Sequence, residues 1–87
     1  MFSVYVLKHS VKGEIYIGVT SDITKRIAEH NQGVQKATKR RAGSWTLVYA
    51  ESYKSQKDAI EREQKLKQHG NNKRWLRDRI KFSLAES

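Results

Sequence analysis

Cysteine is absent from this sequence of 87 residues. Its absence excludes a disulfide framework, a cysteine-ligated zinc site, an iron–sulfur cluster and a thiol nucleophile. Long apolar runs are also absent, because no segment approaches the ~20 residues that a membrane-spanning helix needs. The apolar stretch at residues 1–9 lacks the basic start and the small-residue cleavage site of a signal peptide, so we interpret it as a strand. We therefore expect a cytoplasmic protein with no membrane partner.

Acidic residues are scarce. Nine Asp and Glu stand against 18 Lys and Arg, which gives a formal net charge of +9. Residues 36–87 carry +8 of this charge and residues 1–35 carry +1. A field of this strength attracts polyanions and is typical of a nucleic-acid-binding domain. The length allows one compact domain, expected to span residues 1–87, with a small core.

Alternation of side chains predicts two strands, at residues 2–9 and 14–20, joined as a β-hairpin. A loop centred on residues 10 and 11 would place Tyr5 directly opposite Tyr16. One face of the hairpin would then be aliphatic, and the other would carry both tyrosines.

Capping residues and periodicity predict the remaining elements. We expect a helix from Ser21 or Asp22 to about His30, a strand over residues 45–53, a helix from Ser55 to about Gln68, and a helix from Asn71 or Asn72 to about Leu84 that packs Trp75, Leu76, Ile80 and Phe82. The predicted fold class is therefore α+β. A small three-stranded antiparallel sheet is flanked by three helices in the order ββα-β-αα.

Glu63 is the anomaly of the second predicted helix. At about 100° per residue it falls about 40° from Ala59, inside the apolar stripe that Leu66 completes, whereas Glu61 lies on the solvated side. A carboxylate on a packing face is costly without a cation or a donor. It is either an ion-pair partner of Lys67 at i+4 or a metal ligand in a cleft. A single carboxylate with phosphate and water ligands suits Mg²⁺.

Two further pairs have both an ordinary and a chemical interpretation. Arg26 and His30 lie at i and i+4 of the helix, so the guanidinium and the imidazole can approach the same point. They are either a solvated arginine and a capping histidine, or groups that stabilise and protonate a reacting phosphate. Tyr5 and Tyr16 are either a cross-strand aromatic pair or phenols beside a phosphodiester. Gly18, inside a strand, indicates a close approach to the backbone.

Basic residues outside these pairs are either solvated surface charges or contacts to phosphates. Such contacts would be salt-sensitive and independent of sequence. The candidates for nucleic-acid binding are Lys36, Lys39, Arg40, Arg41, Lys67, Lys73, Arg74 and Arg77. His9 and His69 show no metal-ligand spacing, and we expect both at the surface.

Taken together, these residues resemble the GIY-YIG nuclease domain, both in its small stand-alone bacterial members and in the N-terminal domain of the excision-repair nuclease. The first signature corresponds to Ser3-Val4-Tyr5 and the second to Tyr16-Ile17-Gly18. The resemblance continues through residues 20–26, 29–31, 38–41, 48–49 and 59–67, with Trp45. It covers essentially the whole chain.

The resemblance implies the GIY-YIG nuclease fold and hydrolysis of DNA phosphodiester bonds with Mg²⁺, or another divalent cation such as Mn²⁺. In the family pattern, Tyr5 or Tyr16 helps to activate the attacking water. Arg26 holds the scissile phosphate, His30 supports it, and Glu63 binds the cation. The substrate would be branched or damaged DNA, as in DNA repair or recombination, or DNA of any kind. Because such domains often work beside DNA-binding modules, a targeting protein is an implied partner.

Two departures from the family pattern stand out. The first signature begins with Ser3 where the family has glycine. Larger members also use an asparagine about a dozen residues beyond the catalytic glutamate; Trp75 stands at that place here, with Asn71 and Asn72 before it. Two other functions stay open from sequence. One is a nucleic-acid-binding module of the same fold with little catalysis, and the other is an interaction domain for an acidic protein.

Overall fold

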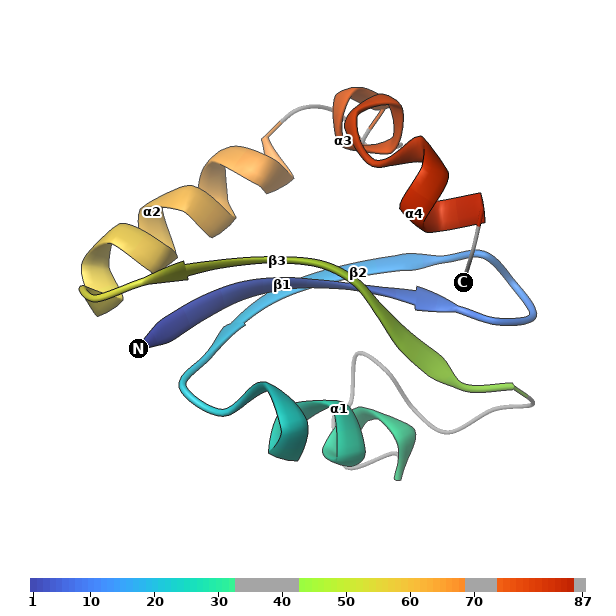
Figure 1. Ribbon diagram of the computed structural model, residues 1–87, viewed down its shortest axis with the longest axis horizontal. Coiled ribbons are helices and arrows are strands. Elements are labelled where there is room, and N and C mark those ends of the chain that lie inside the picture. Colours follow the sequence, from blue (N-terminus) through green and yellow to red (C-terminus); the bar gives the residue numbers. More distant parts are fainter. Residues whose placement is uncertain (33–42, 69–73, 86–87) are drawn as a thin grey trace.

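The computed structural model describes residues 1–32, 43–68 and 74–85 (Figure 1). Its elements are β1 (Phe2–His9), β2 (Ile15–Thr20), α1 (Ile23–Asn31), β3 (Trp45–Tyr53), α2 (Gln56–Lys67), α3 (Arg74–Arg79) and α4 (Lys81–Ala85). The strands form one antiparallel sheet in the order β2-β1-β3. This arrangement confirms the predicted α+β class. In the part of the chain that is described, no helix combines the length and apolar character needed to cross a bilayer.

The helices cover both faces of the sheet. In Figure 1, α1 lies against one face, and α2, α3 and α4 lie against the other. The central strand β1 is therefore buried on both sides, so residues 3–7 of this strand are all buried. On the α2 side the buried core consists of Val4, Val6, Ile17, Ala59, Leu66, Leu76 and Ile80. On the α1 side it consists of Tyr5, Leu7 and Trp45, with Tyr16, Ile23 and Ile27 packed around them.

The register of the hairpin differs from the prediction by two residues. Tyr5 pairs with Gly18 rather than with Tyr16. The turn lies further along the chain because the N–H of Gly13 donates to the carbonyl of His9 at 3.0 Å, and Gly13 adopts a φ of 69°. Glycine populates this left-handed region without a Cβ penalty. A shift of two residues keeps every side chain on its face, so the predicted division into two faces is confirmed.

Helix α1 is fixed at both ends. Asp22 caps its start, with Oδ1 accepting a hydrogen bond from the N–H of Lys25 at 3.1 Å. At its other end the Asn31 amide pairs with the backbone of Trp45. Nδ2 donates to the Trp45 carbonyl at 3.1 Å, and Oδ1 accepts from the Trp45 N–H at 2.7 Å. This double hydrogen bond ties the end of α1 to the beginning of β3.

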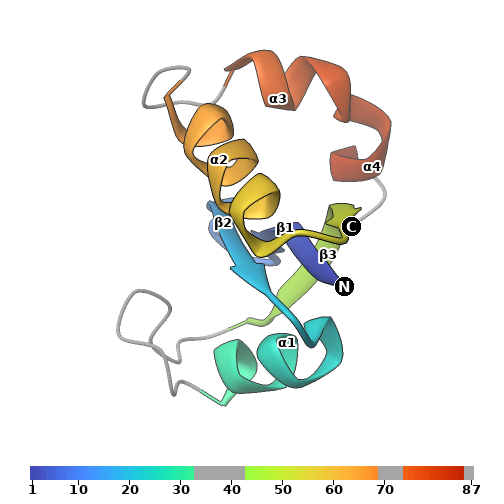
Figure 2. The ribbon, with the colours of Figure 1, turned by 90° about the vertical axis from the view of Figure 1, so that its left-hand side faces the viewer.

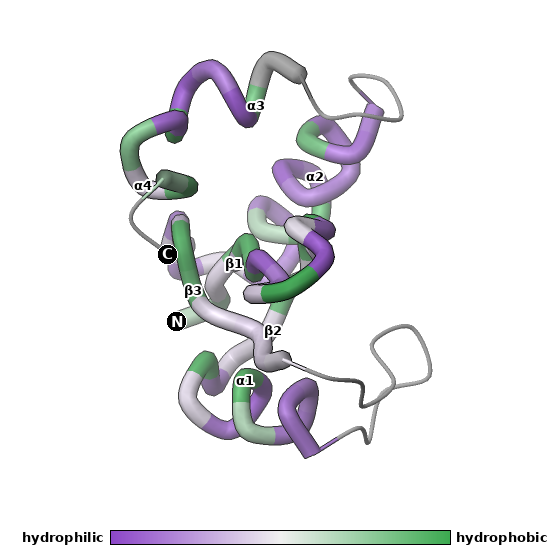
Figure 3. Tube along the Cα trace, turned by 90° about the vertical axis from the view of Figure 1, so that its right-hand side faces the viewer, coloured by the Kyte–Doolittle hydropathy of each residue, from purple (hydrophilic) through white to green (hydrophobic). Residues whose placement is uncertain are grey.

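The helix α2 has the cap and the orientation expected from sequence. Ser55 accepts a hydrogen bond from the N–H of Asp58, and Ala59 and Leu66 are fully buried against the sheet. Glu61 lies on the exposed side. Figure 3 shows α2 as largely hydrophilic, so its apolar stripe is narrow.

The C-terminal helix predicted up to Leu84 is instead two short helices, α3 and α4, so four helices flank the sheet among the described residues. The chain bends at Ile80, which lets Leu84 pack on the core and accept a hydrogen bond from Lys8 at 2.9 Å. The prediction that Phe82 packs in the core was wrong, because its side chain is 73% exposed. Leu76, Ile80 and Leu84 follow a four-residue spacing, whereas Phe82 lies about 200° around the helix from Ile80.

The structure places two further residues that the sequence singled out, His9 and Ser3. His9 is buried rather than exposed, because its ring lies 5.1 Å from that of Trp45 and Nδ1 accepts hydrogen bonds from the N–H groups of Val11 and Lys12. Ser3, at the place of the family glycine, is buried with its Oγ 2.9 Å from that of Ser52. His69 lies outside the described residues.

Candidate active site

Three polar aromatic side chains meet between α1 and the sheet. The Tyr5 hydroxyl and Nε2 of His30 are hydrogen-bonded at 3.0 Å, and both residues are only 1% exposed. The Tyr16 ring lies 4.7 Å from the His30 ring and 6.2 Å from the Tyr5 ring, measured between centroids. Ile23 and Ile27 anchor α1 on this face, which places His30 over the strands. One residue each from β1, β2 and α1 therefore forms a compact cluster.

Gly18 makes room for the cluster. A Cβ at this position would lie 2.5 Å from the Tyr5 hydroxyl oxygen and 2.7 Å from its Cζ. No side chain tolerates such contacts, so only glycine lets the phenol of Tyr5 lie over β2. The close approach expected from sequence is the approach of Tyr5.

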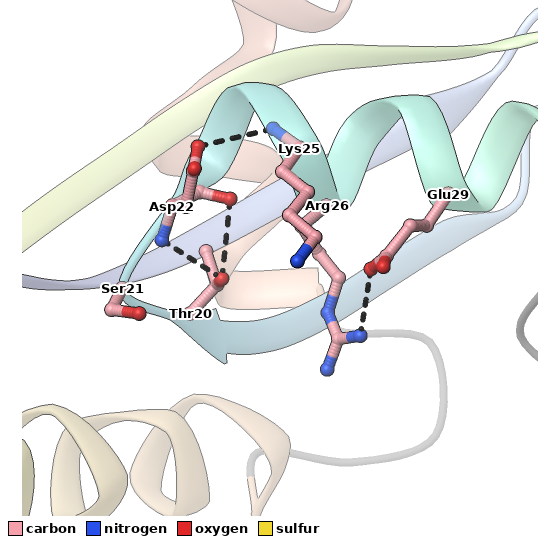
Figure 4. A pocket seen from close by; sticks show the side chains of 6 residues that line it. All are labelled: Thr20, Ser21, Asp22, Lys25, Arg26 and Glu29. Atoms are coloured by element: carbon pink, nitrogen blue, oxygen red, sulfur yellow. Dashed lines mark hydrogen bonds and ion pairs between the residues drawn. The ribbon is translucent and has the colours of Figure 1, made fainter.

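Arg26 lies one helical turn before His30 and points from α1 toward β2 in Figure 4. Its Nη1 is 3.1 Å from Oε1 of Glu29, and its side chain is 34% exposed. Its Nε is buried and has no hydrogen-bond partner among the described residues. Buried donors in folded proteins normally have an acceptor, so this atom is suited to a ligand oxygen. Sequence analysis assigned no role to Glu29, although its i+3 spacing from Arg26 was visible.

An open cleft of about 410 Å³ extends from Arg26 along the beginning of α1. Its lining is polar and comprises Thr20, Ser21, Asp22, Lys25, Arg26 and Glu29 (Figure 4). Thr20 and Asp22 hydrogen-bond each other through the Thr20 hydroxyl and the Asp22 backbone, which fixes the turn from β2 into α1. The cleft gives solvent access to the guanidinium beside the tyrosine–histidine cluster.

Glu63 belongs to α2, which lies on the other face of the sheet from α1. Figure 2 shows β2 at the edge of the sheet, with α2 on one side and α1 on the other. The Glu63 side chain is 19% exposed, and its Oε2 lies 3.4 Å from Nζ of Lys67. Its charge adds the smallest contribution to the raised pKa of Tyr5. The i+4 ion pair that sequence allowed is therefore present.

Burial shifts the ionisation of the cluster. It raises the pKa of Tyr5 to about 12, with further increases from Tyr16 and Glu63 and an opposing effect from the Arg26 guanidinium. Burial also lowers the pKa of His30, and the charge of Arg26 acts in the same direction. At neutral pH, Tyr5 therefore keeps its proton and His30 is uncharged. An uncharged imidazole can accept a hydrogen bond from the phenol.

The structure thus brings together Tyr5, Tyr16 and His30, with Arg26 one helical turn before His30, and places Glu63 on α2 beside Lys67. Few of the predicted nucleic-acid contacts lie among the described residues. Lys36, Lys39, Arg40, Arg41 and Lys73 lie outside the described residues, as do Asn71 and Asn72. Arg74 begins α3, Arg77 is exposed on that helix, and the Lys67 side chain is 48% exposed beside Glu63.

The donors present fit a hard divalent cation that keeps most of its water. Among the described residues, no group of three or more His, Cys, Asp or Glu side chains is close enough to hold a metal ion alone. Mg²⁺ does not need such a group, because one or two carboxylates, waters and substrate phosphate oxygens complete its coordination. The half-buried carboxylate of Glu63 could supply the protein part of such a set.

Comparison with known proteins agrees with this geometry. Residues 1–76 match the GIY-YIG catalytic domain family. The chain therefore belongs to that family, a nuclease superfamily whose members generally use a divalent metal.

Within the family, the similar proteins include those named UPF0213. A UPF0213 protein of Halobacterium salinarum is 40% identical over 68 residues, which cover 78% of this chain and 87% of that protein. A UPF0213 protein of Staphylococcus aureus is 36% identical over 72 residues, or 82% and 85% of the two chains. The solution NMR structure of UPF0213 protein BH0048 from Bacillus halodurans matches with a TM-score of 0.57 and 26% identity, over 98% of this chain and 94% of that one.

Proposed function

We propose that this protein is a Mg²⁺-dependent endonuclease that hydrolyses DNA phosphodiester bonds, with residues 1–87 acting as one domain. The observation that carries the proposal is the meeting of Tyr5, Tyr16 and His30 beside the Arg26 guanidinium, on the face of the sheet under α1. A fold needs none of these groups in its interior, because burying polar side chains costs free energy that aliphatic packing does not.

Arg26 is proposed to bind the scissile phosphate. Its Nε lacks a partner among the described residues, and its guanidinium borders an open polar cleft. A guanidinium presents several donors in a fixed plane, which suits the equatorial oxygens of a phosphate under attack. Glu29 orients the guanidinium by holding Nη1 at 3.1 Å.

The two tyrosines have different proposed roles. Tyr16 is only partly buried, so its hydroxyl is the one placed to orient the attacking water. Tyr5 is buried, has a pKa of about 12 and is hydrogen-bonded to His30. It acts as a phenol that keeps its proton and fixes the geometry of the cluster. Uncharged His30 accepts the hydrogen bond from Tyr5 and holds α1 in register with the strands.

Glu63 is proposed to hold the divalent cation, Mg²⁺ or Mn²⁺. When bound, the cation neutralises the charge that develops on the phosphate and lowers the pKa of a coordinated water. The Glu63 carboxylate also lies 3.4 Å from the ammonium of Lys67, which would add positive charge for the DNA backbone.

DNA is the proposed partner, because the net charge of +9 suits a polyphosphate. The nucleic-acid contacts proposed from sequence, including Arg74 and Arg77 on α3, belong to this surface. Branched or damaged DNA, a targeting protein, a role in DNA repair and a cytoplasmic location remain part of the proposal.

A second candidate is a nucleic-acid-binding module with little catalysis. The ion pair between Glu63 and Lys67 favours it, because a carboxylate already neutralised by an ammonium needs no cation. Both candidates bind phosphates, and both predict an affinity that falls steeply with salt. They differ only in cleavage.

Nicking of supercoiled plasmid separates the two candidates. The parent protein is incubated with plasmid and Mg²⁺, Mn²⁺ or EDTA, beside Glu63→Gln and Glu61→Gln. The proposal predicts nicking with either cation, none with EDTA, none with Glu63→Gln despite retained DNA binding, and unchanged nicking with Glu61→Gln. Retardation of the plasmid without nicking by the parent protein would establish the binding module instead.

A further inference from the structure

Glu51 forms a second polar centre, on the face of the sheet opposite to Tyr5. Its carboxylate oxygens accept four hydrogen bonds. Oε1 accepts from the Tyr53 hydroxyl at 2.6 Å and from Nε of Arg62 at 2.8 Å. Oε2 accepts from the Tyr49 hydroxyl at 2.5 Å and from Nη2 of Arg62 at 3.1 Å. The Glu51 side chain is only 17% exposed, so two tyrosines and a bidentate arginine surround it almost completely.

This network joins two elements. Glu51 and both tyrosines belong to β3, and Arg62 belongs to α2. The Arg62 hydrogen bonds are the largest cause of the depressed pKa of Glu51, which is about 2. The carboxylate therefore stays charged at every pH at which DNA cleavage would be measured.

Apolar packing alone holds α2 weakly against rotation about its own axis. Only Ala59 and Leu66 are buried on this helix of 12 residues, and Figure 3 shows most of the remainder as hydrophilic. Two contacts seven residues apart lie on a single line along the helix. A line fixes the position of the helix but leaves its rotation to other contacts.

Arg62 and Glu63 lie on opposite sides of that line. At about 100° per residue, Arg62 is about 60° to one side of Ala59 and Glu63 is about 40° to the other. Arg62 reaches Glu51 on the edge strand β3, so Glu63 lies on the side of α2 turned away from β3, toward β2. Any rotation of α2 that released Arg62 would therefore move Glu63 as well.

We propose that the bidentate pairing of Arg62 with Glu51 is a positioning device that sets the rotation of α2 and thereby fixes the direction of the Glu63 carboxylate on the β2 side of the helix. Its catalytic consequence rests on the proposed function, in which Glu63 holds the cation. Stability alone is a weak reason for such a pair, because well-packed apolar residues often replace a buried ion pair without loss. A bidentate pair, in contrast, fixes direction as well as distance.

Arg62→Met tests the device in cleavage assays. Methionine keeps the length and the apolar stem of the side chain but removes the fork. We expect kcat for plasmid nicking to fall by about 10–100-fold, since displacing a reacting group by about 1 Å can cost 10² in rate. The Mg²⁺ concentration for half-maximal nicking should rise, and KM for DNA should stay unchanged. Arg62→Lys, which keeps the charge without the fork, should recover only part of kcat.

Two further variants control for stability. Glu51→Gln removes the charge at the other end of the pair and should reproduce the effect on kcat and Mg²⁺ dependence if Arg62→Met does not fold. Ile80→Val weakens the same core without touching the network, and it should lower the melting temperature while leaving kcat unchanged. Retention of kcat and Mg²⁺ dependence within about twofold by both Arg62→Met and Glu51→Gln would overturn the proposal.

A structure of Arg62→Met tests the positioning without any assay of activity. Crystallography or NMR should show α2 rotated on the sheet, with the Glu63 carboxylate displaced by about 1 Å or more from its place relative to the Tyr5 hydroxyl. An unmoved carboxylate would overturn the proposal. This measurement also separates it from the proposed function. If the parent protein nicks no DNA, the nuclease assignment fails, while the rotation of α2 still decides whether Arg62 positions Glu63.

Discussion

The face of the sheet under α2, α3 and α4 buries aliphatic side chains, whereas the face under α1 buries a tyrosine and a histidine that are hydrogen-bonded to each other. The aliphatic face gains its stability from area removed from water and from dispersion contacts. The face under α1 buries groups whose desolvation must be offset one hydrogen bond at a time. The first face is held mainly by apolar burial, whereas the second carries the candidate site.

The comparison also shows how the two faces depend on each other. Glu63 belongs to a helix packed on the aliphatic face, whereas the Tyr5 side chain lies on the face under α1. In the proposed site both layers of helices contribute, Glu63 from one and Arg26 and His30 from the other. Substitutions can alter one face at a time.

Leu66→Ala should have the largest effect, on stability. Leu66 is fully buried against the sheet, and truncation of such a residue costs about 2–5 kcal/mol in the free energy of unfolding. Urea denaturation measures the loss. Phe82→Ala, at a side chain that is 73% exposed, should change stability by less than about 0.5 kcal/mol. A similar loss in both variants would contradict the assignment of the aliphatic core.

Arg26→Ala should affect the other face and spare the fold. Losing a preorganised donor to the phosphate should lower the rate of cleavage by about 10²–10³, or about 2.7–4 kcal/mol. Because the guanidinium is one-third exposed, the free energy of unfolding should change little. Single-turnover nicking measures the rate. Arg26→Lys should rescue it partly, and full activity in that variant would mean that Arg26 is only a diffuse charge.

Acid should weaken the charged network around Glu51 on the aliphatic face. The pKa of Glu51 is lowered from 4.5 to about 2, so the folded state binds this proton less well than the unfolded state. Its contribution is complete above pH 4.5 and is lost as the pH falls from 4.5 to about 2. At about 1.4 kcal/mol per pH unit, the loss is about 3 kcal/mol. Urea denaturation across this range should show a flatter pH dependence for Glu51→Gln, and identical curves would contradict it.

Gly18→Ala should have the smallest effect, and it tests the packing of Tyr5 against β2. The added methyl group would displace the Tyr5 ring, and overpacking of this kind costs about 1–3 kcal/mol. NMR signals of the His30 ring should shift, because its partner Tyr5 moves. In Val11→Ala, at a turn side chain that is 66% exposed, those signals should stay in place. Unchanged His30 signals in both variants would contradict the packing of Tyr5 against Gly18.

Much of the fold followed from local patterns. Period-two alternation predicted the two faces of the hairpin, side-chain caps predicted the beginnings of α1 and α2, and helix periodicity singled out Glu63 over Glu61. These signals are local, because each depends on residues within one or two turns of a helix or along one strand. Arg26 and His30 could be selected for the same reason, since a spacing of four residues determines that they share a side of α1.

The errors arose where distant segments decide the outcome. The hairpin register depended on the conformation of Gly13, and alternation alone is satisfied equally by a shift of two residues. The burial of His9 depended on Trp45, which lies 36 positions further along the chain. Phe82 was expected in the core because it is apolar. The side of these helices that faces the core carries Leu76, Ile80 and Leu84 instead.

The sequence by itself therefore determined the order of strands and helices, the two faces of the sheet and the residues able to form a phosphodiesterase site, because all of these follow from chemical type and local spacing. Only the tertiary structure decided that β1 is central and that Tyr5 meets His30 rather than pairing with Tyr16. It also decided that Glu51 gathers Arg62, Tyr49 and Tyr53. The physical reason is that hydrogen bonds and packing between distant segments depend on how whole elements dock, and docking minimises the buried polar groups left without partners.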